Sequence, residues 1–361
     1  MTLRRVLFRT EAGPLVGLGH LQRCLSLAEA LRQRGIACRF AVNAYAAAWV
    51  GLSGGEAQRL ETEVGSPKDI CAVAELAAGR DGIVVVDSYQ VHAEYLQALS
   101  EAGCWVAAVD DLAAEPFPCR MVVNGSPQAD RLPYRSSHGR TRFLLGSRYA
   151  LLRPELWDAP PRIVRAQMHD VLVTVGGADQ YDLMPPIVRA LDDALPEGVG
   201  VTVVAGPFTE QFASLEACAA QCRHRVVVHS APASVATLFL TADLAVSAGG
   251  QTLYELARAG CPAVVIQTAS NQRGQSEAFA QAGCVLLAGV AGAPDLIQRV
   301  ADGVQQLMAD AGLRASMSAC GQRLIDGQGA ARVAEAMAEQ HERETMMAPA
   351  SGYISDAGGV R

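Results

Sequence analysis

Short apolar runs alternate with amphipathic stretches along the whole chain, and each run has the length of a β-strand. In the first half, the pattern predicts strands at residues 4–8, 38–43, 82–87, 105–110 and 121–124. A second set, which begins at Asp170, predicts strands at 171–175, 201–205, 226–229, 244–247, 263–267 and 284–287. Helical patterns lie between strands, most clearly over 20–34, where apolar residues recur on one face. This alternation is typical of α/β domains with mostly parallel sheets.

Residues 152–162 separate the two sets of strands. This segment is proline-rich and has no periodicity, so it predicts a domain boundary. We therefore expect one α/β domain over 1–155 and another over 156–345. Two such domains joined by one linker leave a cleft between the carboxyl ends of their strands, where ligands bind in such folds. Residues 346–361 contain too little apolar surface to pack and are predicted to form a disordered tail.

The composition of the chain indicates which kinds of partner and which cellular compartment to expect. A formal charge of −7 and the lack of any basic run argue against nucleic acid as a partner. No stretch is long and apolar enough to span a membrane, and residues 1–10 lack a signal-peptide core, so we expect a cytoplasmic protein without stable membrane insertion. The ten cysteines are scattered, many inside apolar elements, which favours reduced thiols over a disulfide framework.

A glycine-bearing loop joins the first strand to the helix predicted over 20–34. Gly17 and Gly19 allow a tight turn and a close approach to a ligand, and His20 then falls in the first turn of the helix. The positive end of the helix disfavours a charged imidazole, so we predict a neutral His20 near pH 7, as a general base requires. An ordinary turn residue on a surface helix is the competing interpretation.

Two glycine turns in the second set of strands predict an anion site. Gly176 and Gly177 follow the strand at 171–175 and form a backbone concavity, although an ordinary tight turn explains them equally well. Gly249 and Gly250 lead into a helix whose free amides and dipole suit a diphosphate.

Polar side chains surround the second of these turns. The helix starts near Gln251, with Thr252 in its first turn and Glu255 about one turn further, where a carboxylate can bind two ribose hydroxyls. A solvated carboxylate is the alternative, but the neighbours of Glu255 are apolar. Asn271 and Gln272 follow the next strand, and paired amides there suit sugar hydroxyls or phosphate oxygens, or otherwise form a turn.

A dinucleotide site does not fit this pattern. The loop at Gly17 lacks a third glycine, and the strand at 38–43 ends without an acidic residue for an adenine ribose. No cluster of Cys, His or carboxylates has metal-ligand spacing, so we expect neither a metal nor a cofactor. The nucleotide elements lie in the second domain and the candidate base in the first.

A series of short motifs resembles the UDP-sugar hydrolase family of pseudaminic acid biosynthesis, which removes UDP from UDP-2,4-diacetamido-2,4,6-trideoxy-β-L-altropyranose. That family is related to the peptidoglycan N-acetylglucosaminyltransferase. The resemblance covers residues 5–335 and implies two Rossmann-like domains facing a central cleft, the GT-B fold. We expect a monomer. The motifs are, in order, 17–25 (GLGHLQRCL), 86–89 (VDSY), 109–112 (VDDL), 123–124 (VN), 145–154 (LGSRYALLRP), 176–179 (GGAD), 247–255 (SAGGQTLYE), 271–272 (NQ) and 325–330 (IDGQGA).

The resemblance implies a role for each candidate. His20 is the implied catalytic base. The implied sugar side comprises Arg9, Glu11, Gly17, Gly19, Asp87 and Tyr89. The implied UDP side comprises Gly176, Gly177, Gly249, Gly250, Gln251, Thr252, Glu255, Asn271 and Gln272. The chain departs from the family pattern Arg-x-Asp-x-Ser, since it has Glu11 and Gly13 in the last two positions, which alters the expected contacts with the sugar.

The implied reaction needs one base rather than two carboxylates. A diphosphate leaves as a stable anion, and a base on the opposite face deprotonates the attacking water, so in-line attack inverts the anomeric carbon. Three alternatives remain: a glycosyltransferase with a UDP-sugar donor, a 2-epimerase of UDP-sugars and a non-catalytic sugar-nucleotide sensor. Residues 43–52 are apolar enough for a surface patch that meets a membrane-borne acceptor, although a buried helix is the favoured interpretation.

Overall fold

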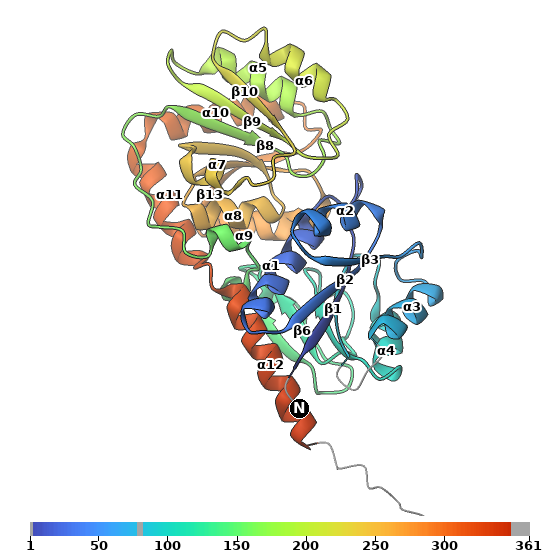
Figure 1. Ribbon diagram of the computed structural model, residues 1–361. Helices are drawn as coiled ribbons and strands as arrows, with labels where there is room; N and C mark the ends of the chain where they lie inside the picture. The colour runs from blue at the N-terminus through green and yellow to red at the C-terminus, as the bar shows by residue number, and fades with distance from the viewer. Residues whose placement is uncertain (1–2, 78–81, 348–361) are drawn as a thin grey trace, which may run out of the picture.

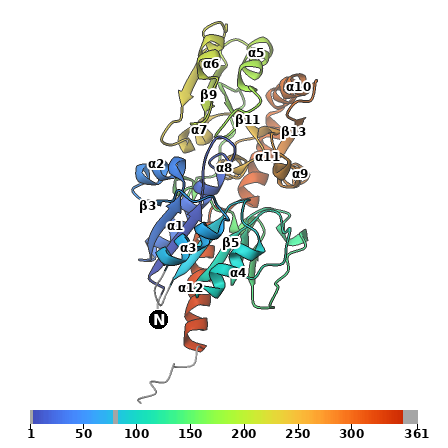
Figure 2. The same cartoon turned by 90° about the vertical axis from the view of Figure 1, so that its right-hand side faces the viewer.

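The computed structural model describes residues 3–77 and 82–347, which form two α/β domains stacked end to end (Figures 1 and 2). The tail predicted over 346–361 lies outside these residues from 348 onward, and Met346 and Met347 end the last helix. Every pairing between the described strands is parallel, as the alternation of strands and helices predicts.

The N-terminal domain contains a sheet of seven strands in the order β3-β2-β1-β4-β5-β6-β7. The order reverses between β1 and β4, so the loops after these two strands diverge and leave a crevice at their carboxyl ends. The strands are β1 Arg5–Thr10, β2 Ala37–Val42, β3 Glu56–Arg59, β4 Ile83–Asp87, β5 Trp105–Val109, β6 Met121–Asn124 and β7 Arg142–Leu145.

Helices cover both faces of this sheet because its strands are apolar on both sides. One face packs against α1 and α2, and the other packs against α3 and α4. The helices are α1 Gly19–Gln33, α2 Ala44–Leu52, α3 Pro67–Ala77 and α4 Ala93–Glu101. Helix α2 buries Ala46 and Val50 but leaves Tyr45 and Leu52 exposed, so it is a surface helix rather than the buried one expected over 43–52.

The C-terminal domain repeats this design with six strands in the order β10-β9-β8-β11-β12-β13. Its strands are β8 Asp170–Thr174, β9 Gly200–Ala205, β10 Val226–Ser230, β11 Leu244–Ala248, β12 Ala263–Gln267 and β13 Val285–Val290. Its helices are α5 Met184–Ala194, α6 Phe212–Ala219, α7 Ala236–Thr241, α8 Gln251–Ala259, α9 Arg273–Gln281, α10 Leu296–Ala309 and α11 Ala311–Leu324. Short 3-10 turns lie at Ala129–Arg131, Ser147–Tyr149, Pro154–Leu156 and Ser270–Gln272.

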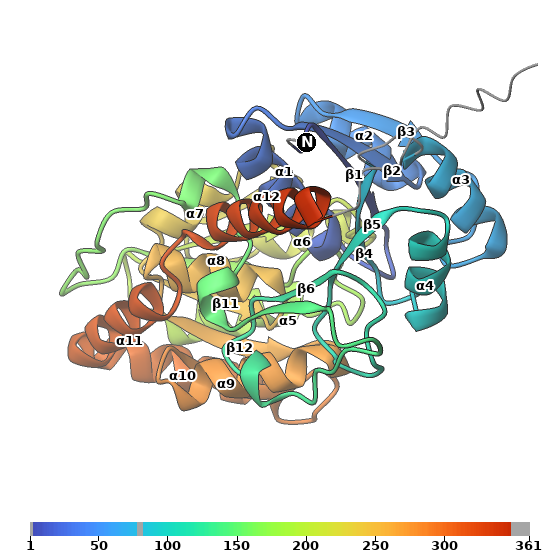
Figure 3. The same cartoon turned by 90° about the horizontal axis from the view of Figure 1, so that it is seen from below.

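The last helix, α12 Gly329–Met347, returns to the first domain. Figure 3 shows it alongside α1, and its Val333 and Met337 belong to the apolar core formed by β1 and α1. The domain boundaries predicted from the sequence assigned this helix to the second domain. In the structure this helix packs on the first domain. A linker at 152–162 does not indicate that the chain crosses back.

Candidate active site

A cleft of about 650 Å³ lies between the two domains, within the usual size of a small-molecule site. Its walls are loops and helix starts at the carboxyl ends of strands from both sheets. From the first domain come the loops after β1, β4 and β5, and from the second come those after β8, β9, β11 and β12. Parallel strands place all their carboxyl ends at one edge, and here the two edges face each other.

The glycine loops of the two domains lie against each other at the cleft. Gly17 has φ +75°, a left-handed conformation that favours glycine. A side chain on Gly177 would place its Cβ 3.2 Å from the backbone nitrogen of Leu18, so the second domain approaches the first through a residue without a side chain. Across the same gap Gln180 Nε2 donates to the carbonyl of Pro14 at 2.9 Å. The glycine turns therefore bring the two domains into direct contact in the cleft wall.

His20 lies in the first turn of α1, as predicted, and contributes to the cleft wall although only 5% exposed. Its Nδ1 contacts Asp87 Oδ1 at 2.6 Å. Asp87 ends β4, which pairs with β1 so that Thr10 and Asp87 are adjacent. A carboxylate on Nδ1 fixes the neutral tautomer that carries its proton there, which leaves the lone pair on Nε2.

Asp87 is itself held by Arg23, one helical turn after His20. Arg23 Nε donates to Asp87 Oδ2 at 2.6 Å, and Nη2 donates to Oδ1 at 2.8 Å. The remaining nitrogen of Arg23 donates to both oxygens of Asp111, at 2.9 and 2.7 Å. Burial alone raises the pKa of Asp87, but the charges and hydrogen bonds of Arg23 and His20 lower it to about 2. Asp87 is therefore a carboxylate throughout the physiological range.

Tyr89 extends this network to the second domain. Its hydroxyl donates to Asp111 Oδ2 at 2.7 Å and accepts a hydrogen bond from Asn271 Nδ2 at 2.9 Å across the cleft. Its ring packs edge-on against His20, with centroids 4.4 Å apart. Burial raises the pKa of Tyr89, and the negative charge of Asp111 raises it further, so the hydroxyl keeps its proton.

The second domain supplies the start of α8 and the turn after β12. Gln251 and Thr252 line the cleft at the first turn of α8, where backbone N–H groups lack helical partners. Glu255, only 2% exposed, pairs with Arg153, whose Nε donates to Oε1 at 2.8 Å and whose Nη2 donates to Oε2 at 3.4 Å. The pair places one anion and one cation side by side on the cleft wall.

Comparison with known proteins gives distant sequence relatives. No family model matches the chain. SpsG of Bacillus subtilis (strain 168), a spore coat polysaccharide biosynthesis protein, is 23% identical over 345 residues, which cover 92% of this chain and 98% of SpsG. A Helicobacter pylori protein is named pseudaminic acid cytidylyltransferase and UDP-2,4-diacetamido-2,4,6-trideoxy-β-L-altropyranose hydrolase. It is 23% identical over 270 residues, 74% of this chain but only 45% of that protein.

Solved structures with the same architecture cover nearly the whole chain. MurG of Acinetobacter baumannii superposes with a TM-score of 0.60 at 14% identity and covers 93% of this chain and 99% of its own. The calicheamicin glycosyltransferase CalG4 gives 0.64 at 16% identity, with 97% and 100% covered. MnaA of S. aureus, solved with UDP, gives 0.64 at 12% identity, with 93% and 96% covered. The chain has the GT-B fold.

Within this GT-B cleft, most of the predicted residues come together. Lining residues include Glu11, Gly17, Gly19, His20, Tyr89, Gly176, Gly177, Gly250, Gln251, Thr252, Glu255, Asn271 and Gln272. Glu11 is held by two neighbours from the loop after β4: Ser88 Oγ donates to Oε1 at 2.5 Å and Gln90 Nε2 donates to Oε2 at 3.2 Å. Asp87 and Gly249 lie behind the wall, beneath His20 and against Ser276 respectively.

The structure does not bring Arg9 to the cleft. Arg9 is 1% exposed, and its guanidinium binds Asp69 through Nε at 3.0 Å and Nη2 at 2.8 Å. Its other nitrogen donates to backbone carbonyls of Thr10 and Ala41. Successive side chains of a strand point to opposite faces, so Arg9 and Thr10 diverge at the end of β1. Arg9 therefore joins β1 to α3 through Asp69 and has a structural place in the first domain.

Three residues of the GT-B cleft were missed as site residues. Arg23 binds both Asp111 and Asp87, and Arg153 binds Glu255. The spacing of Arg23, three residues after His20, places both on one helix face and was an available signal. Arg153 lies in the linker, where no local pattern indicates that it turns towards α8.

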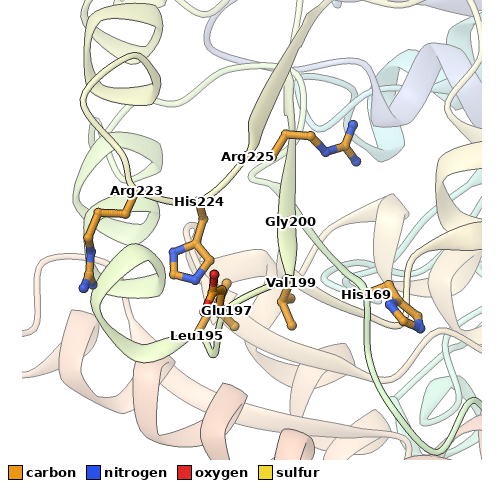
Figure 4. Close-up of a pocket in the computed structure, with 9 residues that line it drawn as sticks. His169, Leu195, Glu197, Val199, Gly200, Arg223, His224 and Arg225 are labelled. Atoms are coloured by element: carbon orange, nitrogen blue, oxygen red, sulfur yellow. The ribbon is translucent and has the colours of Figure 1, made fainter.

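A second hollow lies far from the cleft in this GT-B domain pair. It is lined by charged residues at the amino ends of β9 and β10, the opposite edge of the sheet from the cleft (Figure 4). Arg223 and Arg225 point away from each other in Figure 4, and His224 binds Asp192 at 2.9 Å and the Pro196 carbonyl at 3.1 Å. The charged groups do not converge, so the cleft is the candidate site.

Over 3–77 and 82–347, no three or more His, Cys, Asp or Glu side chains are grouped to hold a metal ion. Within the same ranges, no helix combines the length and apolar character that crossing a membrane requires.

Proposed function

We propose that the protein hydrolyses a UDP-linked deoxy-diamino sugar to UDP and the free sugar. UDP-2,4-diacetamido-2,4,6-trideoxy-β-L-altropyranose or a close relative is the proposed substrate. The observation that carries the proposal is the contact between His20 Nδ1 and Asp87 at 2.6 Å, in the wall of an interdomain cleft. This pairing leaves Nε2 to accept a proton from water, which is the one task that the reaction demands of a base.

The proposed reaction proceeds by in-line attack. Water on the His20 side of the sugar loses a proton to Nε2 as its oxygen attacks the anomeric carbon, and the bond to UDP breaks on the opposite face. The product sugar has the inverted configuration. Asp87 stabilises the imidazolium that forms, and Arg23 keeps Asp87 ionised and oriented.

The proposed leaving-group site is the start of α8. Free amides in the first turn of a helix and its positive end favour a diphosphate that gains charge as the bond breaks. Gln251 and Thr252 line this end of the cleft, and Glu255 would bind ribose hydroxyls from one turn further along the helix. Glu11, with Ser88 and Gln90, forms a polar wall near the base that suits the sugar.

The relatives support the same chemistry. The H. pylori protein is named a hydrolase of this UDP-sugar, and MnaA of the same fold was solved with UDP. A glycosyltransferase is the second candidate, because the calicheamicin glycosyltransferase CalG4 shares the fold and the cleft extends along α1 and α2 past Leu25 and Trp49. An acceptor hydroxyl there would take the place of water.

Incubation of the purified protein with UDP- and CMP-linked deoxy-diamino sugars, without any acceptor, distinguishes these functions. We expect UDP and free sugar in equal amounts, and NMR of the first product should show the inverted anomer. In water labelled with ¹⁸O, the label should enter the sugar and not UDP. Release only after an acceptor is added would instead assign a transferase, an epimerised UDP-sugar would assign an epimerase, and binding without turnover would assign a sensor.

The variant His20→Asn tests the base directly. We expect its kcat to fall by about two to four orders of magnitude with little change in UDP affinity. His138→Asn is a matched control, because His138 is exposed and lies outside the cleft. Near-normal turnover by folded His20→Asn protein would remove His20 from the role.

A further inference from the structure

Two cysteine thiols face each other within the second domain, away from the cleft. The Sγ atoms of Cys284 and Cys320 are 2.8 Å apart, close enough for one S–H to donate to the other sulfur. Cys284 directly precedes β13, and Cys320 lies in the last turns of α11. Neither residue lines the cleft, and neither has a part in the reaction proposed above.

The two thiols differ in their access to solvent. Cys284 is 3% exposed, whereas Cys320 is partly exposed and also donates to the carbonyl of Ala282 at 2.8 Å. The turn between α9 and β13 therefore lies directly against α11. A reagent in solution reaches Cys320 first, and Cys284 is the sulfur next to it.

We propose that Cys284 and Cys320 are a modification site, at which a low-molecular-weight disulfide such as glutathione disulfide introduces an intramolecular disulfide. The Cys320 thiolate attacks one sulfur of the reagent, which releases one thiolate and leaves a mixed disulfide on Cys320. Cys284 then loses its proton to solvent and attacks Cys320 Sγ, which releases the second thiolate. Two cysteine thiols are oxidised and one reagent disulfide is reduced to two thiols.

The geometry favours the second step. A disulfide bond is about 2.05 Å long, so the sulfurs need to approach by only about 0.8 Å. Burial raises the pKa of the Cys284 thiol, which slows its attack, but the neighbouring sulfur is held in contact throughout. Cys222 lies shortly after α6, and its Sγ donates to the carbonyl oxygen of Cys218.

The crosslink would join α11, which packs on α8, to the turn that follows α9. Both α8 and α9 line the cleft. Helix α9 begins next to Asn271 and Gln272 and ends at the turn that precedes Cys284. Helix α11 packs tightly on α8, since a Cβ on Gly321 would lie 2.7 Å from the carbonyl oxygen of Ala257. A bond between residues 36 apart also restricts the unfolded chain. We expect the oxidised protein to unfold at a temperature about 5 °C higher.

Oxidation of the full-length protein with glutathione disulfide tests the site. After the remaining thiols are alkylated, peptide mapping should find the peptides that contain Cys284 and Cys320 linked, with a mass two hydrogens below the sum of the two reduced peptides. The melting temperature should rise and return to its original value with dithiothreitol. Cys71→Ser is the control. Cys71 is exposed and should form only a mixed disulfide with one glutathione, so this variant should keep both the link and the rise in melting temperature.

Each single variant, Cys284→Ser and Cys320→Ser, should lose the link and the rise in melting temperature. If Cys284→Ser does not fold, Cys320→Ser remains informative, because its residue is partly exposed. Glutathione that stays on Cys320 in the wild-type protein, a link between other cysteines, or two free thiols after oxidation would each overturn the proposal. None of these outcomes depends on whether the protein hydrolyses a UDP-sugar.

Discussion

Replacing Asp87 with Asn removes one charge from beneath His20 and keeps the size of the side chain. In the wild-type protein, Asp87 Oδ1 contacts His20 and Arg23, and Oδ2 accepts from Arg23. Asn has only one side-chain oxygen. We expect this oxygen to accept the hydrogen bonds from Arg23, because every side-chain nitrogen of Arg23 is a donor. The amide nitrogen then donates to His20 Nδ1, so the ring proton moves to Nε2 and the proposed base loses its lone pair on the cleft side.

The size of the effect follows from these contacts. Loss of the correct histidine tautomer in the serine protease template costs about 10⁴ in kcat, and general acid–base catalysis contributes about 10² to 10⁴. We therefore expect Asp87→Asn to lower kcat by about 10² to 10⁴, or about 2.7 to 5.4 kcal/mol of transition-state stabilisation. Breaking a buried pair destabilises proteins by about 3 to 5 kcal/mol, and the lower end applies here because Arg23 keeps Asp111.

The assay measures kcat across pH together with UDP affinity by calorimetry. Asp69→Asn is a matched control, because Asp69 is also fully buried and also pairs with an arginine, Arg9, but lies away from the cleft. It should lower stability and leave kcat and its pH profile intact. The reasoning fails if folded Asp87→Asn keeps more than about a tenth of wild-type kcat, or if Asp69→Asn loses as much.

Three further predictions concern the nucleotide, the sugar and acid stability. Glu255→Gln keeps the shape of the carboxylate but removes its charge, so UDP should bind about 1.5 to 3 kcal/mol more weakly by calorimetry; unchanged affinity would remove Glu255 from the site. Glu11→Asp should change the ratio of kcat/KM between two stereoisomeric UDP-sugars by several-fold to about a hundredfold, with UDP inhibition constant. Gly13→Ser, whose Cβ would face the Tyr45 ring at 3.4 Å, should leave that ratio nearly unchanged. Because Arg23 and His20 lower the pKa of buried Asp87 from 3.8 to about 2, its contribution of about 2 kcal/mol is complete above 3.8 and is lost as the pH falls towards 2. Acid unfolding of Asp87→Asn should lack that component, and equal pH dependence of the two proteins would contradict this account.

The sheets could be predicted where their strands are buried. Strands β6 and β12 have the bounds expected from their apolar runs, because both faces of these strands are covered by helices. Strand β3 was missed since all four residues of Glu56–Arg59 are exposed at the sheet edge and show no apolar pattern. Strand β7, Arg142–Leu145, was also missed: it is four residues long, and only one of them is fully buried.

The site could be predicted only as far as local chain geometry determines it. A glycine turn before a helix is a local feature, so the loops around Gly17 and Gly249 were recognisable, and the order of parallel strands brings them to one cleft. Charge pairing is not local: Arg9 and Asp69 are 60 residues apart, and Arg153 and Glu255 are 102 apart. Only the register of β1 against β4 decides that Asp87 lies beneath His20.

The hydrogen-bond network around His20 indicates what each domain contributes to the proposed reaction. Asp87, Arg23 and Asp111 all belong to the first domain, so His20 keeps its orientation whether or not Asn271 reaches Tyr89. The proposed leaving-group site at the start of α8 belongs to the second domain. The proposed base and the proposed leaving-group site therefore come from different domains, and the proposed reaction needs both on one substrate. It follows that a sugar without its nucleotide should not be turned over. UDP alone should inhibit, because it would occupy the proposed leaving-group site at the start of α8.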